Sequence, residues 1–386
     1  MCDTKAETVA FTNTSKAADA SDQPIQVTAP AASSGNSALQ RHRKPRLFYL
    51  DWVRALSVLL IVVTHFNNPF LANKPIFVNS PFGIYIGSLG VSQFLIISGA
   101  ALMYNYEDEE HLNLKVFYWK RFKSIYPMFW IAFIIANVYL MIHAGVIAAR
   151  APKWTLILSA VGMDGYLANA GFHTFYTLGE WFLGFIVLFY VIFPILRYGV
   201  KNHPWATAAI GLILYALTLL LHIPVHHMPQ DLLLTTRLPE LLFGMYFVRF
   251  IKKVPHWLGG VSVVLLVLQQ IFKPVKGDLA VTLVGLCFFL FLVWISQWLD
   301  IRPIRKIIGS LSKYSYAIFL VHHQVIIQVF TAVNPATLNP IGAYILFFAD
   351  FVIIMALSVA LQVLNKKTLA YVKAMFARPW RERITQ

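Results

Sequence analysis

The sequence predicts an all-α membrane protein with about ten transmembrane helices and both termini on the cytoplasmic side. Three observations support this prediction. Hydrophobic residues make up 58% of the 386-residue chain and charged residues only 13%, about half of their usual share in a soluble domain. Ten apolar runs are long enough to cross a bilayer. Basic residues gather in every second connection between these runs.

The ten apolar runs define the expected helices in chain order. Each is close to the roughly 20 residues that an α-helix needs to cross a hydrocarbon core about 30 Å thick. The runs are 47–66, 83–104, 125–146, 178–197, 205–222, 232–250, 257–273, 279–298, 313–333 and 341–364. We find no internal repeat among them and expect no second folded domain.

The distribution of Lys and Arg orients the chain. With the amino terminus inside, the inner side receives most of the basic residues, beginning with the cluster Arg41–Arg46. An even number of helices also places the basic carboxyl-terminal tail inside, as the positive-inside rule requires. The net charge of +15 therefore reflects membrane topology, and we expect no nucleic-acid partner. The outer connections hold only Lys74, Arg150, Lys153, Lys273 and Lys276.

Composition divides the chain into three parts. Residues 1–45 are rich in Ala, Ser and Thr, end in the basic cluster and lack a secretory signal, so we expect a disordered cytoplasmic tail with a basic anchor. Residues 46–365 form the membrane domain. Residues 366–386 form a second basic cytoplasmic tail.

The first apolar run carries one arginine and one histidine, Arg54 and His65. Eleven residues at about 100° each bring both side chains to nearly the same side of a helix, roughly 16 Å apart along its axis. Polar groups inside membrane helices usually face the bundle interior, which favours a site. The equal alternative is that Arg54 anchors the helix at the interface and His65 marks its far end.

Further polar residues fall inside the other runs, in larger number than passive helices need. Arg237 and Glu240 lie one turn apart, a spacing that suits either a structural ion pair or a binding site. Together these residues predict a polar cavity through the bundle, as in a transporter or an intramembrane enzyme. The residues are Glu180 in the fourth run, Arg237 and Glu240 in the sixth, His322 and His323 in the ninth and Asp350 in the tenth.

Two connections are long enough to carry function. The inner connection 105–124 opens with four acidic residues and becomes basic and aromatic, which is typical of an interfacial helix or of an anion-binding rim. The outer connection 147–177 is the longest, and we expect a lid or a re-entrant segment there. No metal site is expected, because neither the histidine pairs nor Cys2 and Cys287 have ligand spacing.

Six motifs in order resemble the bacterial integral-membrane acyltransferase-3 family. No single motif is specific to the family, but the six motifs in this order over residues 46 to about 365 are. The motifs are Tyr49–Arg54 with His65 eleven residues on, Gly90–Gly99, Lys120–Pro127, Trp181 with Phe189, Tyr190 and Pro194, Arg237–Gly244, and Ser315–His322.

The resemblance implies a membrane O-acyltransferase of the bacterial plasma membrane. Its donor would be a cytoplasmic acyl-coenzyme A, most simply acetyl-CoA, and no permanently bound cofactor is implied. Its acceptor would be a hydroxyl of a surface or secreted polysaccharide, with membrane lipid and polysaccharide-assembly proteins as further partners. The same chemistry on a lipid or small molecule, or transport without chemistry, remains an alternative.

The resemblance also implies roles for individual residues. Arg54, Arg121 and Lys123 would bind the phosphates of the donor. His65 would act as general base or be acylated itself, because an imidazole with an ordinary pKa near 6.5 suits both roles. Glu180 would assist His65 in catalysis. Arg237 and His322 would bind the acceptor substrate.

The chain departs from the family pattern at two places. The family often has a second arginine three residues before the proline of the basic motif, where this chain has Ser124. If that arginine holds a phosphate, Lys123 must replace it as a less directional charge. We also expect no hydrolase-like extracellular domain of the kind that many relatives carry after the last helix, so either the membrane domain or a separate protein would complete the transfer.

Overall fold

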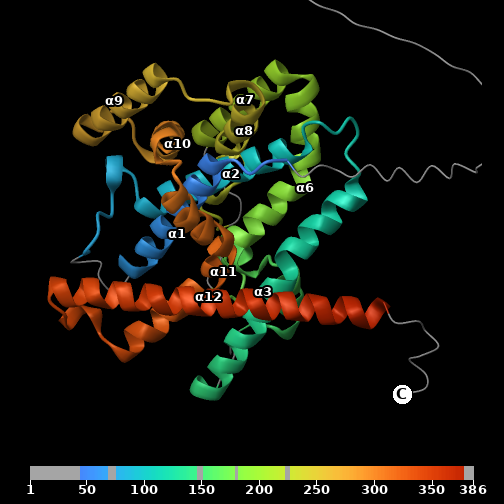
Figure 1. Ribbon diagram of the computed structural model, residues 1–386, viewed down its shortest axis with the longest axis vertical. Helices are drawn as coiled ribbons and strands as arrows, with labels where there is room; N and C mark the ends of the chain where they lie inside the picture. The colour runs from blue at the N-terminus through green and yellow to red at the C-terminus, as the bar shows by residue number, and fades with distance from the viewer. Residues whose placement is uncertain (1–43, 68–74, 146–150, 179–180, 222–226, 378–386) are drawn as a thin grey trace, which may run out of the picture. The chain divides into compact units, whose positions relative to one another are not determined.

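The computed structural model describes residues 44–67, 75–145, 151–178, 181–221 and 227–377, and every regular element within them is a helix (Figure 1). The chain separates into Met1–Lys44 and Pro45–Gln386, and all the helices belong to the second unit. The all-α membrane fold is therefore confirmed. The predicted disordered tail lies outside the described residues.

The α-helices follow the predicted runs closely. They are α1 Phe48–Asn67, α2 Ile86–Tyr106, α3 Leu114–Ala144, α4 Leu156–Ala160, α5 Asp164–Ala168, α6 Trp181–Asn202, α7 Pro204–Leu221, α8 Leu238–Tyr246, α9 His256–Phe272, α10 Gly277–Leu299, α11 Arg302–Ala332 and α12 Pro340–Ala377.

Within the described ranges, eight helices are long and apolar enough to span a membrane, where the sequence predicted about ten. The other two runs form shorter helices. The helix α9 has 17 residues, and α8 has nine before a π-helical turn, Phe247–Ile251. The start of α8 is delayed because Thr236 and Arg237 donate to the carbonyls of Gln230 and Asp231 in the preceding turn.

Three helices extend well beyond their predicted runs, and one of them, α11, begins at Arg302 where the run was predicted from residue 313. The helix α3 begins at Leu114, where the Asn113 side chain accepts a hydrogen bond from the Val116 amide, so the basic motif is helical. The helix α12 continues through residue 365 to Ala377 without a break. Its 38 residues span roughly 57 Å, well beyond the core of a bilayer.

The helix α2 is the most buried of the spanning helices and packs on α1, α8 and α10. Two glycines bring the backbones of α2 and α8 into contact. A Cβ atom on Gly99 would collide with the carbonyl of Leu241, and one on Gly244 would collide with the carbonyl of Ile96. Small residues permit this close approach in membrane helices. Two glycines of the sequence motifs therefore serve packing.

The outer connection forms short helices that dock on the bundle. Trp130 donates to the carbonyl of Ala160, Tyr126 donates to that of Val161, and Tyr166 donates to that of Leu232. The helix α5 packs against α6, where Gly184 lies against the Tyr166 side chain. These contacts tie the segment 156–168 to α3, α6 and the segment before α8.

Candidate active site

The helix α1 places Arg54 and His65 on an unbroken segment that packs on α2, α10 and α11 (Figure 1). Since the helix has no kink, the predicted axial separation of roughly 16 Å applies. Arg54 lines a cavity of about 300 Å³, and His65 lines a second cavity of about 30 Å³. Both residues therefore face the interior of the bundle.

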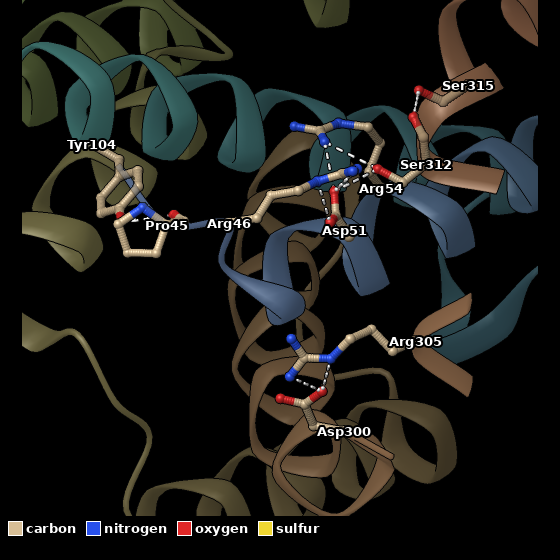
Figure 2. Close-up of polar contacts among 9 residues, drawn as sticks. All are labelled: Pro45, Arg46, Asp51, Arg54, Tyr104, Asp300, Arg305, Ser312 and Ser315. Atoms are coloured by element: carbon tan, nitrogen blue, oxygen red, sulfur yellow. Dashed lines mark hydrogen bonds and ion pairs between the residues drawn. The ribbon is translucent and has the colours of Figure 1, made fainter. Parts of the chain in front are cut away.

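The Asp51 carboxylate fixes the position of Arg54 (Figure 2). Arg54 Nη1 lies 3.2 Å from Asp51 Oδ1 and 3.1 Å from Ser312 Oγ, and Ser312 in turn donates to Asp51 at 2.7 Å. Arg46 pairs with the same carboxylate, with its Nε 2.8 Å from Oδ2. One negative charge thus serves two guanidinium groups, which leaves this cluster with a net positive charge.

The cavity of about 300 Å³, here called the cation cavity, lies between α1, α2, α3, α6 and α11. Two guanidinium groups, those of Arg54 and Arg121, line it, and none of its described lining residues is acidic. Its polar lining also includes hydroxyl and amide groups, several of which already donate to backbone carbonyls. They belong to Ser98, Asn105, Ser124, Tyr190, Ser315 and Tyr316.

Three aromatic rings surround the guanidinium group of Arg121. Its Cζ atom lies 5.9 Å from the ring centres of Tyr106 and Phe117 and 5.7 Å from that of Tyr190. Within the described part of the chain, Arg121 Nε is buried without a hydrogen-bond partner. The rings fix the position of the charge without neutralising it, so it remains available to a bound anion.

The basic motif divides between two faces of α3. Arg121, Ser124 and Ile125 line the cation cavity, as the spacing i, i+3, i+4 requires. Lys123 does not line it, and its ammonium group lies 5.3 Å from the ring centre of Trp119. The structure therefore places Arg54 and Arg121 at the same cavity and Lys123 outside it. Ser124, which stands where the resemblance to the family predicts arginine, faces the cavity.

The cavity of about 30 Å³, here called the histidine cavity, is lined by His65, His322 and apolar or aromatic side chains. The rings of His322 and His323 both lie 4.9 Å from that of His65, measured between centres. Sequence reasoning named His323 as a polar residue of the ninth run but gave it no role at the site, because neighbouring helical residues point apart. Within the described residues, no group of three His, Cys, Asp or Glu side chains is arranged to hold a metal ion.

Hydrogen bonds fix the neutral tautomer of His322. Its Nδ1 lies 3.1 Å from the Ile318 carbonyl and 2.8 Å from the Phe319 carbonyl. Carbonyl oxygens only accept, so Nδ1 carries the hydrogen, and Nε2 of the neutral ring is an acceptor. Among the described residues, Nε2 is buried with no partner. His322 therefore offers a proton acceptor beside His65.

Three phenylalanines, Phe94, Phe182 and Phe319, line both cavities and form their shared boundary. The ring centres of Phe94 and Phe182 are 5.8 Å apart, and those of Phe182 and Phe319 are 5.9 Å apart. The shortest route from Arg54 and Arg121 to His65 through the described cavities therefore passes these rings. We call them the phenylalanine boundary.

The other predicted site residues that the structure describes do not join this cluster. Arg237 is 2% exposed and lines neither cavity; it pairs with Glu240 at 3.2 Å and donates to the Asp231 carbonyl at 2.7 Å. Its role in acceptor binding stays a prediction. Glu180 lies outside the described residues, so its predicted catalytic role also stays a prediction. Asp350 is buried in α12 and lines neither cavity.

Comparisons with known proteins agree with these motifs. The family model Acyl_transf_3, described as an acyltransferase domain, matches residues 47–364. The acyltransferase MdmB of Streptomyces mycarofaciens is 27% identical over 179 residues, which are 44% of this chain and 44% of that relative. The chain thus aligns with under half of the curated relative's length. No solved structure matches the chain.

Proposed function

Because the chain belongs to the acyltransferase-3 family and is therefore an acyl-transferring enzyme, we propose that it acylates hydroxyl groups with acyl-coenzyme A as donor. The acyl group is acetyl or a close homologue. The acceptor is a cell-surface or secreted polysaccharide, and the enzyme acts in the bacterial plasma membrane. The observation that carries the proposal is that a cavity with two guanidinium groups adjoins a cavity with His65.

The charge of the cation cavity supports a phosphorylated donor. Guanidinium groups bind phosphate through paired, charge-assisted hydrogen bonds. Arg54 uses only Nη1 for its bonds to the described residues, so Nε and Nη2 can bind the donor. Asp51 and Ser312 hold this arginine in place before the donor arrives, which lowers the entropic cost of binding.

The position of His65 supports general-base chemistry. The roughly 16 Å between Arg54 and His65 is of the order of a pantetheine arm, so donor phosphates at Arg54 would leave the thioester near His65. His65 then takes the proton of the acceptor hydroxyl as its oxygen attacks the thioester carbonyl carbon. A C–O bond forms, the C–S bond breaks, and the coenzyme A thiolate leaves and is protonated.

The neighbouring imidazoles support the same step. A general base needs its second nitrogen oriented and its proton passed on after each turnover. The rings of His322 and His323 lie against His65 and supply nitrogen atoms at that place. In this proposal His65 contacts the substrate, while His322 and His323 position its ring and carry protons.

The acceptor assignment rests on the family resemblance. A deletion strain should lose base-labile acyl groups from its surface or secreted polysaccharide, and the wild-type gene should restore them. If the polysaccharide is unchanged while the purified enzyme still acylates lipid extracts or small hydroxyl compounds, the acceptor belongs to that class instead.

The donor assignment is tested on the full-length protein in lipid nanodiscs. Wild type should release free coenzyme A thiol from acetyl-CoA when an acceptor fraction is present. His65→Ala should abolish this release at equal protein level, whereas His203→Ala, which removes an exposed histidine between α6 and α7, should retain it. Full activity of His65→Ala would remove His65 from the mechanism.

A further inference from the structure

We infer that the histidine cavity selects the acyl group by size, so that the enzyme uses acetyl and excludes longer chains. This inference rests on the proposed function, because it concerns the acyl group that the donor presents to His65. It assigns specificity to Ile61 and Val91, which line the histidine cavity but not the cation cavity.

The volume of the histidine cavity sets the limit. A water-sized group needs about 10–15 Å³ of such space, so a cavity of about 30 Å³ holds two or three small groups. The acetyl group has three non-hydrogen atoms, butyryl has five and octanoyl has nine. Of these three groups, acetyl is the closest in size to the space beside His65.

On the proposed path, a longer acyl chain has to enter the histidine cavity. The proposed path takes the pantetheine arm through the cation cavity and past the phenylalanine boundary, so these spaces are filled when the thioester reaches His65. The part of the acyl group beyond its carbonyl must then enter the histidine cavity. Its wall is set by side chains and not by open lipid, since Ile61 and Val91 are only 7% and 8% exposed.

The walls cannot retreat easily. Ile61 and Val91 belong to α1 and α2, which pack extensively on each other, and α2 touches the backbone of α8 at Gly99 and Gly244. Inserting extra methylene groups into such a packed site forces neighbouring side chains out of their rotamers. Discrimination by a rigid apolar pocket is about 10- to 200-fold per methylene group.

Wild-type enzyme provides the first test, with kcat/KM for coenzyme A release measured for acetyl-, butyryl- and octanoyl-CoA in nanodiscs. We expect acetyl-CoA to exceed butyryl-CoA by about 100-fold or more, and octanoyl-CoA to give no measurable turnover. Equal use of acetyl and octanoyl donors would overturn the inference while leaving the proposed function intact. Failure to consume any acyl-CoA would overturn the proposed function and the inference with it.

A matched pair of variants provides the second test. Val91→Ala enlarges the histidine cavity, whereas Val62→Ala removes the same atoms from a 1% exposed valine that packs in a cluster with residues of α11 and α12. We expect Val91→Ala to raise the butyryl-to-acetyl ratio of kcat/KM about 10-fold, and Val62→Ala to leave the ratio unchanged. Ile61→Val serves as a milder second variant and should shift the ratio in the same direction.

The outcomes of the variant test are distinct. A raised butyryl-to-acetyl ratio of kcat/KM in Val91→Ala and Ile61→Val, but not in Val62→Ala, supports size selection at this cavity. An unchanged ratio in folded Val91→Ala protein, or an equal shift with Val62→Ala, overturns it. Thermal melting of each variant shows whether the protein is folded before the ratio is interpreted.

Discussion

The two ends of α1 face cavities that differ in volume, in charge and in the kind of side chains that line them. The Arg54 end faces about 300 Å³ of space with two guanidinium groups and several hydroxyl groups. The His65 end faces about 30 Å³ of space with imidazole, indole and phenyl rings. In the proposed mechanism, one helix therefore separates anion binding from bond making. Variants at the Arg54 end should change the donor KM, and variants at the His65 end should change kcat.

The largest expected effect is at the His65 end. His65→Ala should lower kcat by about 10²- to 10⁴-fold, the usual contribution of a general base, and leave the donor KM within a few-fold of wild type. Steady-state release of coenzyme A thiol measures both constants. A raised KM with normal kcat would instead make His65 a binding residue and break the comparison.

Replacement of Arg237, which is buried and lines neither cavity, should lower the stability of the fold more than it changes catalysis. Arg237→Met leaves Glu240 buried without its cation, which should cost about 3–5 kcal/mol of stability. Arg54→Met should cost less, because Asp51 keeps its ion pair with Arg46. Thermal melting in detergent compares the two variants. A stable Arg237→Met protein with a raised acceptor KM would return Arg237 to the acceptor site.

The Arg54 end should respond to loss of directional hydrogen bonds. Arg54→Lys keeps the charge but removes the planar pair of donors, and we expect the donor KM to rise about 10-fold with kcat little changed. The control is Arg305→Lys, which alters an exposed arginine that pairs with Asp300 and lies over the Phe48 ring at the start of α1 (Figure 2). An unchanged donor KM in Arg54→Lys would remove this residue from the coenzyme site.

The smallest expected effect is a gain in affinity for the donor. Ser124→Arg would add a third guanidinium group to the cation cavity, and the donor KM should fall several-fold. Lys123→Ala should change it little, because that ammonium group lies over Trp119 and away from the cavity. The opposite pattern, with Lys123→Ala raising KM and Ser124→Arg without effect, would show that the donor binds on the other face of α3.

Much of this arrangement could be predicted from the sequence because it depends on local periodicity. The apolar runs give the spanning helices, and the spacing of Arg54 and His65 gives their common face. Lys123 was expected at the donor site because the family resemblance places an arginine at the neighbouring position, where this chain has Ser124. Asn113 caps a helix that includes the basic motif, and helical spacing then separates Lys123 from Arg121.

The remaining site features depend on how different helices meet. Asp51 is a neighbour of Arg54 in sequence, but its partner Ser312 lies 261 residues away on α11. The contact between His323 and His65 depends on how α1 and α11 pack, and the His65 ring lies against both histidines of α11. The phenylalanine boundary needs the placement of α2, α6 and α11 together, which no pattern within one segment encodes.

The glycine contacts between α2 and α8 also determine which parts of the passage can move. Backbones that touch at Gly99 and Gly244 cannot slide past each other, so Phe94, five residues from Gly99 on α2, is the stationary side of the passage. Within the described residues, neither α6 nor α11 meets a neighbour at a glycine whose added Cβ would collide with a backbone carbonyl, so we expect Phe182 on α6 and Phe319 on α11 to form its moving side. Widening of the route between donor and acceptor then requires rotation of these two rings, or of the helices that carry them, while α2 stays in place.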